Sequence, residues 1–467
     1  MAIFGEFRRQ VVEVALPDLK SWARRQGWLV ALAQRLPDPW REWLAGLPAR
    51  GLQRRLAFRR TRRWRQAALR AACAPEEPAI AASAQFGPHA GVNVFAYARG
   101  QFGLGEAARL YTQALLAAGY PVGVHDIALD VPHGMDDRSL EGRLGGEPRH
   151  AVNLVFANPD SLAAAIESIG ASRFRGRYTI ACWFWELEKF PEEWRPALSM
   201  VDEIMVSTRF VGDMLGAATA KPILHVPLPA IAAPDSGLQR RDFGLRPDAF
   251  LFLNSFDFNS YLPRKNPLAA IGAFRAAFPA GENVQLLVKS SNGYRHPQAL
   301  RELLAAAASD PRIVVRDEVI DKCHVQALQR CADAYVSLHR AEGFGLGLAE
   351  CMRLGKPVVA TAWSGNMEFM TPYNSCLVGY RLVEVGADQY PHADGQRWAE
   401  PDIGQAAAHM RRLVHEPGLA ARIGARAAAD IAERLAPQRV AVDLVERLQE
   451  LALRCPQPQR CDNGGRT

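Results

Sequence analysis

The stretch that decides the fold is Leu338–Glu350, which reads LHRAEGFGLGLAE. It begins at the end of the apolar run Ala334–Leu338 and leads into a helical pattern, so the predicted order is strand, glycine loop and helix. The glycines would allow a sharp turn and would bring main-chain N–H groups at a helix start toward an anion. Glu342 and Glu350 frame this loop. The stretch therefore indicates a ligand loop with two carboxylates, against the alternative of a plain glycine turn with a capping glutamate.

A second unit of the same kind begins at Gly91. An apolar run from 91 to 97 is followed by a glycine loop that contains Gly103 and Gly105, and then by helical apolar spacing up to Gly119. The spacing of the glycines does not match the dinucleotide fingerprint, so a nicotinamide or flavin cofactor is not expected. The loop is either a phosphate-facing turn or an ordinary tight turn.

Apolar strand patterns alternate with helical patterns along the rest of the chain, in two series separated by the turn-rich residues 229–247. Such alternation predicts an α/β protein with two doubly wound parallel sheets and a cleft between them. The expected strands are 122–127, 152–156, 178–183, 203–207 and 223–226 in the first series, and 250–254, 284–289, 313–316, 334–338 and 357–361 in the second. Helices are expected at 297–308 and 321–332, with two or three more between 403 and 453. The expected domains are an extension and linker (1–88), an amino-terminal Rossmann-like domain (89–235), a carboxyl-terminal Rossmann-like domain (236–435), and a final helix with a disordered polar tail (436–467).

The positive charge of the chain, formally +7 over 467 residues, is concentrated at its beginning. Residues 1–75 combine many arginines with Trp22, Trp28, Trp40, Trp43 and Trp64, which predicts a basic helical extension. Such helices can lie on an anionic membrane surface, and the alternative is an extension packed on the main body. Nucleic-acid binding is not expected, because no fold signature for it accompanies these residues.

Cysteine usage and hydropathy favour a cytoplasmic protein, placed at the inner face of a membrane if the extension binds lipid. The eight cysteines form no CxxC pair and lie mostly in apolar segments, so they are expected to be reduced thiols. The start of the sequence does not match a secretory signal. No window approaches 18 uninterrupted apolar residues, so no transmembrane span is expected.

Aromatic and acidic residues follow the strand expected at 178–183. Trp183 and Glu186 lie just beyond its carboxyl end, where open α/β sheets bind their ligands. Aromatic rings can stack on a sugar and carboxylates can accept hydrogen bonds from its hydroxyls. These two residues are therefore candidate acceptor or sugar contacts, and the alternative is a tryptophan-rich patch that closes the cleft between domains.

Residues 90–450 resemble the retaining nucleotide-sugar glycosyltransferases of family 4, which have the GT-B fold. Glu342 and Glu350 match the Glu-x7-Glu motif of that family, and the following strand sequence also matches. Lys265 stands at the position of its donor-phosphate lysine. The loop of Gly103 and Gly105 takes the place of its amino-terminal diphosphate loop, and Glu368 falls in its Gly-x-x-Glu loop.

Three positions depart from the family pattern. Asp257 and Phe258 stand where an arginine is usual, which leaves Arg264 as the candidate substitute. The usual histidine after an amino-terminal strand is replaced by the tryptophan-rich segment, so its role at the sugar would pass to Glu186 or lapse. The double glycine before Glu368 reads Ser364-Gly365-Asn366.

The resemblance implies a retaining hexosyltransferase that moves a sugar from a nucleotide diphosphate sugar to a glycan acceptor, in the synthesis of a lipid-linked or surface polysaccharide. The implied catalytic residues are Glu342, Lys265 and Arg264. The expected donor-binding residues are Gly103, Gly105, Phe344, Gly345, Leu346, Gly347 and Glu350. No Asp-x-Asp motif follows an expected strand, so neither a metal nor another cofactor is expected. The alternatives are a non-catalytic subunit that binds sugar nucleotides or glycans in the same cleft, and an epimerase or phosphorylase.

Overall fold

The computed structural model describes residues 86–87, 89–231, 234–279 and 281–454, all of which belong to one compact unit. The predicted basic extension with its five tryptophans, and the predicted polar tail from Cys455, lie outside the described residues. The predictions of helices, membrane contact and disorder for these two segments therefore stay predictions.

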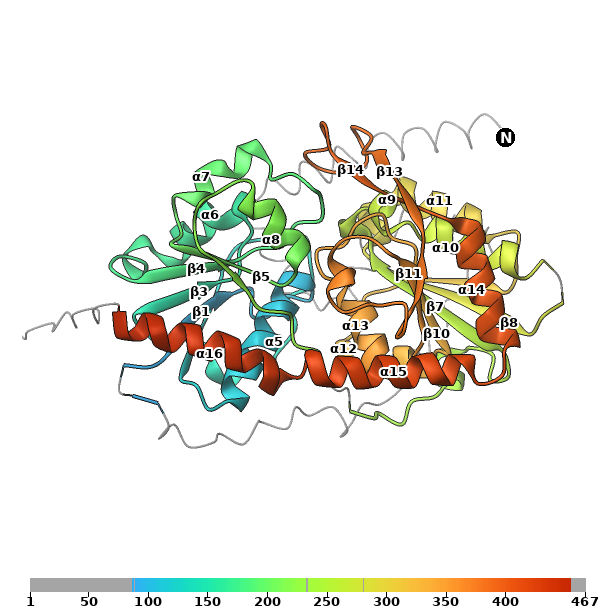
Figure 1. The fold of residues 1–467 in the computed structure, drawn as a ribbon, viewed down its shortest axis with the longest axis horizontal. Helices are drawn as coiled ribbons and strands as arrows, with labels where there is room; N and C mark the ends of the chain where they lie inside the picture. The colour runs from blue at the N-terminus through green and yellow to red at the C-terminus, as the bar shows by residue number, and fades with distance from the viewer. Residues whose placement is uncertain (1–85, 88, 232–233, 280, 455–467) are drawn as a thin grey trace, which may run out of the picture. The chain divides into compact units, whose positions relative to one another are not determined.

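The first sheet consists of six parallel strands in the order β2-β1-β3-β4-β5-β6 (Figure 1). Their sequences are rich in valine, isoleucine and leucine, as expected for strands covered on both faces. The order reverses between β1 and β3, which creates a switch point where ligands bind in such sheets. The strands are β1 Val92–Ala96, β2 Val122–Asp126, β3 Val152–Val155, β4 Tyr178–Cys182, β5 Glu203–Val206 and β6 Ile223–His225, and the main helices are α5 Gly103–Ala117, α6 Pro159–Ile169, α7 Arg195–Leu198 and α8 Arg209–Gly216.

The second sheet also has six parallel strands, in the order β12-β11-β10-β7-β8-β9. Its switch point lies between β10 and β7, which are neighbours in the sheet although far apart in the sequence. The strands are β7 Phe250–Asp257, β8 Val284–Ser291, β9 Ile313–Asp317, β10 Ala334–Ser337, β11 Val358–Thr361 and β12 Cys376–Val378, and the helices are α9 Leu262–Lys265, α10 Pro267–Ala277, α11 Pro297–Ala307, α12 Lys322–Cys331, α13 Leu346–Arg353 and α14 Ile403–His415.

Two further elements connect the sheets. The antiparallel hairpin β13 (Tyr380–Glu384) and β14 (Arg397–Pro401) belongs to the second half of the chain, but its loop packs into a hydrophobic cluster with side chains of the first sheet. After α15 (Leu419–Arg434), which packs on α13, helix α16 (Pro437–Arg454) returns to the first sheet and packs on α5 (Figure 1). Arg447 of α16 forms an ion pair of 2.7 Å with the buried Glu203.

The structure confirms the predicted fold, two doubly wound parallel sheets. Every expected strand is present, and the region 403–453 forms three helices. Strand β7 is longer than expected and runs to Asp257. Strand β12 and the hairpin β13–β14 were not predicted from the sequence, because β12 is only three residues long and β13 is largely exposed.

The expectation of reduced cysteines is confirmed at four positions and wrong at one. Cys182, Cys331, Cys351 and Cys376 are free, whereas Cys323 is disulfide-bonded. Of the helices in the described part of the chain, none is long and apolar enough to cross a membrane.

Candidate active site between the two sheets

The switch point of the second sheet brings together the two loops that carry the predicted catalytic residues. β7 leads through a short 3-10 turn into α9, which holds Arg264 and Lys265. β10, the neighbouring strand, leads into the loop with Glu342. Because parallel strands end at the same edge of a sheet, these side chains, 77 or 78 positions apart in the sequence, meet at one place.

Glu342 is buried and forms ion pairs with both cations. Its Oε1 accepts a hydrogen bond of 2.5 Å from Lys265 Nζ, and its Oε2 lies 3.3 Å from Arg264 Nη1. Arg264 also donates to the carbonyl oxygens of Ser260 and Ala341, at 3.1 and 3.0 Å. The arginine, 4% exposed, is therefore fixed by its contacts, whereas 19% of the lysine side chain remains exposed.

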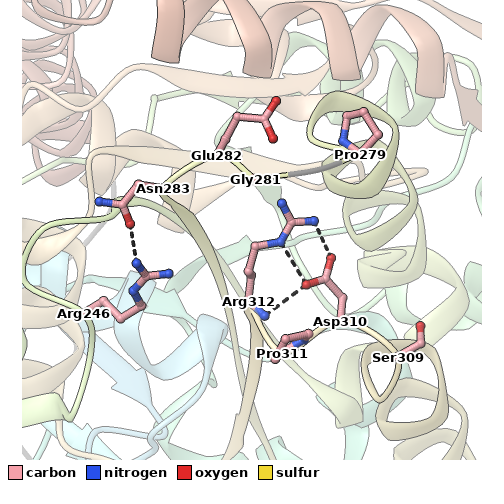
Figure 2. A pocket seen from close by; sticks show the side chains of 9 residues that line it. All are labelled: Arg246, Pro279, Gly281, Glu282, Asn283, Ser309, Asp310, Pro311 and Arg312. Atoms are coloured by element: carbon pink, nitrogen blue, oxygen red, sulfur yellow. Dashed lines mark hydrogen bonds and ion pairs between the residues drawn. The ribbon is translucent and has the colours of Figure 1, made fainter.

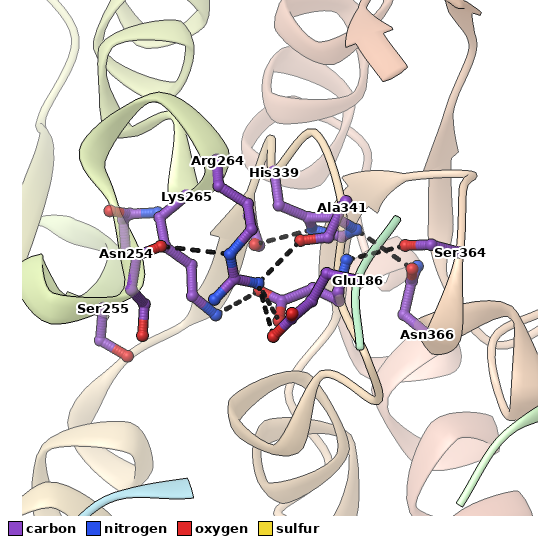
Figure 3. A network of polar contacts seen from close by, with 12 residues as sticks. Glu186, Asn254, Ser255, Arg264, Lys265, His339, Ala341, Ser364 and Asn366 are labelled. Carbon is purple, nitrogen blue, oxygen red and sulfur yellow. Dashed lines mark hydrogen bonds and ion pairs between the residues drawn. The ribbon is translucent and has the colours of Figure 1, made fainter. Parts of the chain in front are cut away.

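A carboxylate from the first sheet completes this group. Glu186, in the loop after β4, lies 3.5 Å from the same Arg264 Nη1 and accepts a hydrogen bond of 2.7 Å from the hydroxyl of Tyr390. Tyr390 belongs to the loop of the β13–β14 hairpin, and its ring lies 5.6 Å from the Arg264 guanidinium carbon. Figure 3 shows Glu186 approaching Arg264 and Lys265 from a different segment of the chain. We call Glu186, Arg264, Lys265 and Glu342 the Glu342 cluster.

The pKa values follow from this burial and pairing. Burial alone would raise the pKa of Glu342, but Lys265 and Arg264 outweigh it and lower the pKa to about 2. Burial lowers the pKa of Lys265, and Glu342 restores it only in part. Burial would also lower the pKa of Arg264, but Glu186, Tyr390 and Glu342 raise it above its ordinary value. Glu342 and Arg264 are therefore both charged at neutral pH.

The backbone around Glu342 is held by the loop after β11. The N–H of Glu342 donates to Ser364 Oγ at 2.8 Å, and the N–H of Gly365 donates to the carbonyl of Glu342 at 2.8 Å. Ser364 has φ 74°, in the left-handed region that favours glycine, which explains why a double glycine would fit this loop. A Cβ on Gly365 would overlap the carbonyl oxygen of Gly343. Two loops thus fix the position of the carboxylate.

His339 lies beneath this loop and is completely buried. Its Nδ1 is 3.0 Å from Ser337 Oγ and its Nε2 is 3.1 Å from Asn366 Oδ1, and burial lowers its pKa. The ring is therefore neutral at pH 7 and serves to hold the two loops together (Figure 3).

Glu350 lies one turn into α13, in a different environment from Glu342. Its Oε2 accepts a hydrogen bond of 2.8 Å from Gln329, and its Oε1 lies 3.4 Å from Lys322 Nζ, both on α12. Lys322 also pairs with Glu106, in the first turn of α5 in the first sheet. Glu106 in turn binds Arg109 at 2.7 Å. We call Glu106, Lys322 and Glu350 the Lys322 bridge.

The bridge brings the first glycine loop to the vicinity of Glu350. Gly103 and Gly105 open helix α5, whose first turn carries Glu106. A Cβ on Gly105 would lie 2.6 Å from the carbonyl oxygen of Gly100, so only glycine allows the helix to approach the loop so closely. The structure therefore places both predicted glycine loops at the helices that the Lys322 bridge connects.

The remaining predicted donor residues form the start of α13. Gly345 has φ 92° and precedes the first helical residue, Leu346. Phe344 is buried against Phe369, with ring centroids 5.1 Å apart. The first N–H groups of a helix have no intrahelical acceptor, so those of Leu346 and Gly347 are available to a ligand.

Trp183 is 2% exposed, and its ring stacks on Phe190 in a hydrophobic cluster. In this conformation the predicted sugar contact at Trp183 has no exposed face. Glu186, three residues later, does reach the Glu342 cluster. The structure thus separates two neighbours that the sequence analysis grouped together.

A hollow of about 560 Å³ lies elsewhere, at the amino ends of β8 and β9 (Figure 2). Two of its arginines are held by neighbouring side chains: Arg312 forms an ion pair of 2.8 Å with Asp310, and Arg246 donates a hydrogen bond to the amide oxygen of Asn283. This is the edge opposite to Glu342, away from the carboxyl ends of the strands where ligands bind.

Comparisons with known proteins agree with this geometry. Residues 255–389 match the family described as glycosyl transferases group 1, a segment that contains Arg264, Lys265, Glu342 and Glu350. Among solved structures, Anabaena HepE in complex with UDP-glucose has 14% identity and a TM-score of 0.57, covering 78% of this chain and 100% of HepE. The fold is GT-B. Sucrose-phosphate synthase from Thermosynechococcus elongatus shares this GT-B fold, with 15% identity and a TM-score of 0.56, covering 78% of this chain and 99% of that one.

At these identities the solved structures establish the GT-B fold alone. No sequence among curated proteins matches the chain. The group 1 match begins in the last residues of β7 and ends in the loop of the hairpin. The carboxylates Glu342 and Glu350 therefore lie within it, and Glu186 lies outside it.

Several residues of the site were not predicted from the sequence. Lys322 lies on α12 and Tyr390 in the loop of the β13–β14 hairpin, both outside the segments predicted to form the site, and neither belongs to a recognisable motif. Thr208, which caps α8, donates to the carbonyl of Gly343 at 3.1 Å and so joins the first sheet to the Glu342 loop. The position of Lys322 at a helix start, where a cation is unfavourable, was the one available signal.

Proposed function

We propose that the protein is a retaining glycosyltransferase of family 4, a hexosyltransferase that moves a sugar from a nucleotide diphosphate sugar to a glycan acceptor. The observation that carries the proposal is the Glu342 cluster: a buried, ionised carboxylate with two cations at the switch point of the sheet that matches the group 1 family. The complex of HepE with UDP-glucose supports a nucleotide sugar as the donor class.

The diphosphate would be bound by Lys265 and by main-chain N–H groups. The Lys265 ammonium uses one donor on Glu342 and has two left for phosphate oxygens. The free N–H groups at the start of α13, and those at Gly103 to Gly105 at the start of α5, add the positive potential of helix N-termini. These groups oppose the negative charge that grows on the leaving diphosphate, so we also propose that no metal is needed.

Glu342 would act on the sugar. Its carboxylate is ionised, and it can accept hydrogen bonds from sugar hydroxyls and stabilise positive charge at the ring in the transition state. Arg264, which has no freedom to turn toward a ligand, would keep Glu342 in place. We propose retention by attack on the same face as the departing diphosphate, because the resemblance to family 4 implies this route and not a double displacement through two acids.

The other predicted residues would bind the ribose of the donor and the acceptor or the sugar. Glu350 would accept hydrogen bonds from the ribose hydroxyls, and the loop with Glu186 would face the acceptor or the sugar. We propose a glycan acceptor of lipid-linked or surface polysaccharide synthesis, with the basic residues 1–75 as a peripheral membrane contact at the cytoplasmic face.

A donor screen followed by a turnover assay tests this function. The full chain is first tested for thermal stabilisation by a panel of nucleotide sugars, since a ligand that binds the native state raises the melting temperature. Release of free nucleoside diphosphate is then measured with and without glycan acceptors, for the wild type and Glu342→Gln. We expect acceptor-dependent release that is lost in the variant. Binding without release under any acceptor would instead favour the non-catalytic binding subunit.

A further inference from the structure

The Glu342 cluster contains two carboxylates that come from different sheets and share one nitrogen atom. Glu186 and Glu342 lie 3.5 and 3.3 Å from Arg264 Nη1, so their nearest oxygens are at most 6.8 Å apart, the sum of these distances. The two carboxylates are therefore close enough to contact the same sugar ring. A sugar bound at Glu342 therefore has the second carboxylate close to its substituents.

Both cations of the Glu342 cluster already have partners. Arg264 is buried, donates to two carbonyl oxygens and lies over the Tyr390 ring. Lys265 pairs with Glu342 and, under the proposed function, turns its remaining donors to the diphosphate. His339, behind the loop, is neutral. Within the described part of the chain, no further basic group contacts either carboxylate, so nothing there would neutralise a third negative charge.

Glu186 is also held in place by contacts to both of its carboxylate oxygens. Its Oε1 faces Arg264 and its Oε2 accepts the 2.7 Å hydrogen bond from Tyr390. Tyr390 is 8% exposed and packs against Trp185, with ring centroids 5.5 Å apart. The carboxylate thus has a fixed position and cannot swing away from a ligand, because both of its oxygens are bound.

We propose that this pair of carboxylates determines which donor sugars are accepted: neutral or amino sugars bind, and nucleotide-linked uronic acids are excluded. This inference rests on the proposed function and specifies its substrate class. Hydroxyl and ammonium groups can donate to Glu186 and Glu342, whereas the carboxylate of a uronic acid can only be repelled by them. Glu186 acts here as a specificity residue, and Tyr390 as a positioning residue.

The test compares two sugars that differ only in oxidation at one carbon. Binding of UDP, GDP, ADP and dTDP, and of the glucose and glucuronate conjugates of each, is measured by calorimetry on the full chain. For the nucleotide that binds, we expect the glucuronate conjugate to bind at least about tenfold more weakly than the glucose conjugate, and more weakly than the bare nucleotide. Glu186→Gln, which keeps the shape and removes the charge, should reduce this ratio to about threefold or less.

Tyr390→Phe is the matched control, because it removes the hydrogen bond to Glu186 and leaves the charge. It should retain most of the discrimination between the two sugars, because Arg264 still pairs with Oε1 of Glu186. Equal binding of glucose and glucuronate conjugates by the wild type, or an unchanged ratio in Glu186→Gln, would overturn the inference and leave the proposed function intact. Failure of every nucleotide to bind the wild type would overturn the proposed function itself.

Discussion

Glu342 and Glu350 lie eight residues apart on one loop and helix, but the structure gives them different surroundings. Glu342 is buried between two cations, one of which cannot move. Glu350 pairs with Lys322, a cation that it shares with Glu106 and whose side chain is 35% exposed. Two acids of one sequence motif can therefore have different roles: Glu342 is fixed between buried cations, whereas Glu350 shares a partly exposed lysine with another carboxylate.

The largest effect is expected from removing the charge of Glu342. Glu342→Gln should lower turnover by about 10²- to 10³-fold, as for the loss of a preorganised electrostatic group. The corresponding change Glu350→Gln should raise the KM for the donor and have a much smaller effect on kcat. Steady-state kinetics of the two variants measures this contrast, and equal losses of kcat would remove the distinction between the two acids.

Glu342→Ala should lower the stability of the protein as well as its activity. Removing one partner of a buried ion pair costs about 3–5 kcal/mol, because the cations lose their counter-charge. Glutamine keeps the volume and can still accept hydrogen bonds, so it is the better variant for separating activity from folding.

The pH dependence of stability should show that Glu342 is ionised in the native state. The pKa of Glu342 falls from 4.5 to about 2 on folding, so its ionised form stabilises the native state by an amount on the order of 3 kcal/mol. This contribution is complete above pH 4.5 and is lost as the pH falls toward 2. Urea unfolding of the wild type and Glu342→Gln should show a difference that is largest at pH 7 and shrinks below pH 4.5. A difference independent of pH would contradict the ionised cluster.

A smaller effect is expected when the loop beneath Glu342 is displaced. The Cβ of Gly365→Ala would overlap the Gly343 carbonyl, and overpacking of this kind costs about 1–3 kcal/mol. Activity should fall with it, because the Glu342 loop must shift. Gly216→Ala in α8 is the control, since its Cβ would meet no atom within 4 Å. Thermal unfolding compares the two, and equal stability would show that the loop is not tightly fixed.

The smallest effect is expected at the Lys322 bridge. Lys322→Met should raise the KM for the donor about two- to fivefold and leave kcat nearly unchanged, because a partly exposed ion pair contributes only a small free energy. Lys322→Arg should restore most of the affinity. Lys221→Met, at the amino end of β6 and away from both glycine loops, serves as the control. A fall in kcat as large as that of Glu342→Gln would mean that the bridge is part of the chemistry.

The fold and the centre of the site could be predicted because both have local signatures. Buried strands are continuous apolar runs, and the loop with Glu342 follows one of them directly. The β13–β14 hairpin lacks such a signature, because its first strand, Tyr380–Glu384, is largely exposed. Lys322 and Tyr390 were missed for another reason. Lys322 pairs with Glu106 and Tyr390 with Glu186, and the two members of each pair are more than 200 residues apart in the sequence, so only tertiary packing brings them together.

The burial of Trp183 also shows that the orientation of a side chain could not be predicted from its position in the sequence. Its position after a strand correctly placed its segment near the cleft, but whether a ring faces a ligand or the core depends on neighbours such as Phe190 and on the packing around them. Sequence position indicates the edge of the sheet, and packing decides which side chain points into the site.

Calorimetry can show whether a nucleotide diphosphate binds at Lys265 with its sugar at Glu342. UDP, GDP, ADP and dTDP, with their glucose conjugates, are titrated into the wild type, Lys265→Met and Glu342→Gln. We expect Lys265→Met to weaken binding of the bare nucleotide about tenfold, as for a lost hydrogen bond to a charged group. Glu342→Gln should leave binding of the bare nucleotide unchanged and remove only the additional affinity of its glucose conjugate. Unchanged nucleotide affinity in Lys265→Met would show that the diphosphate does not bind at this lysine.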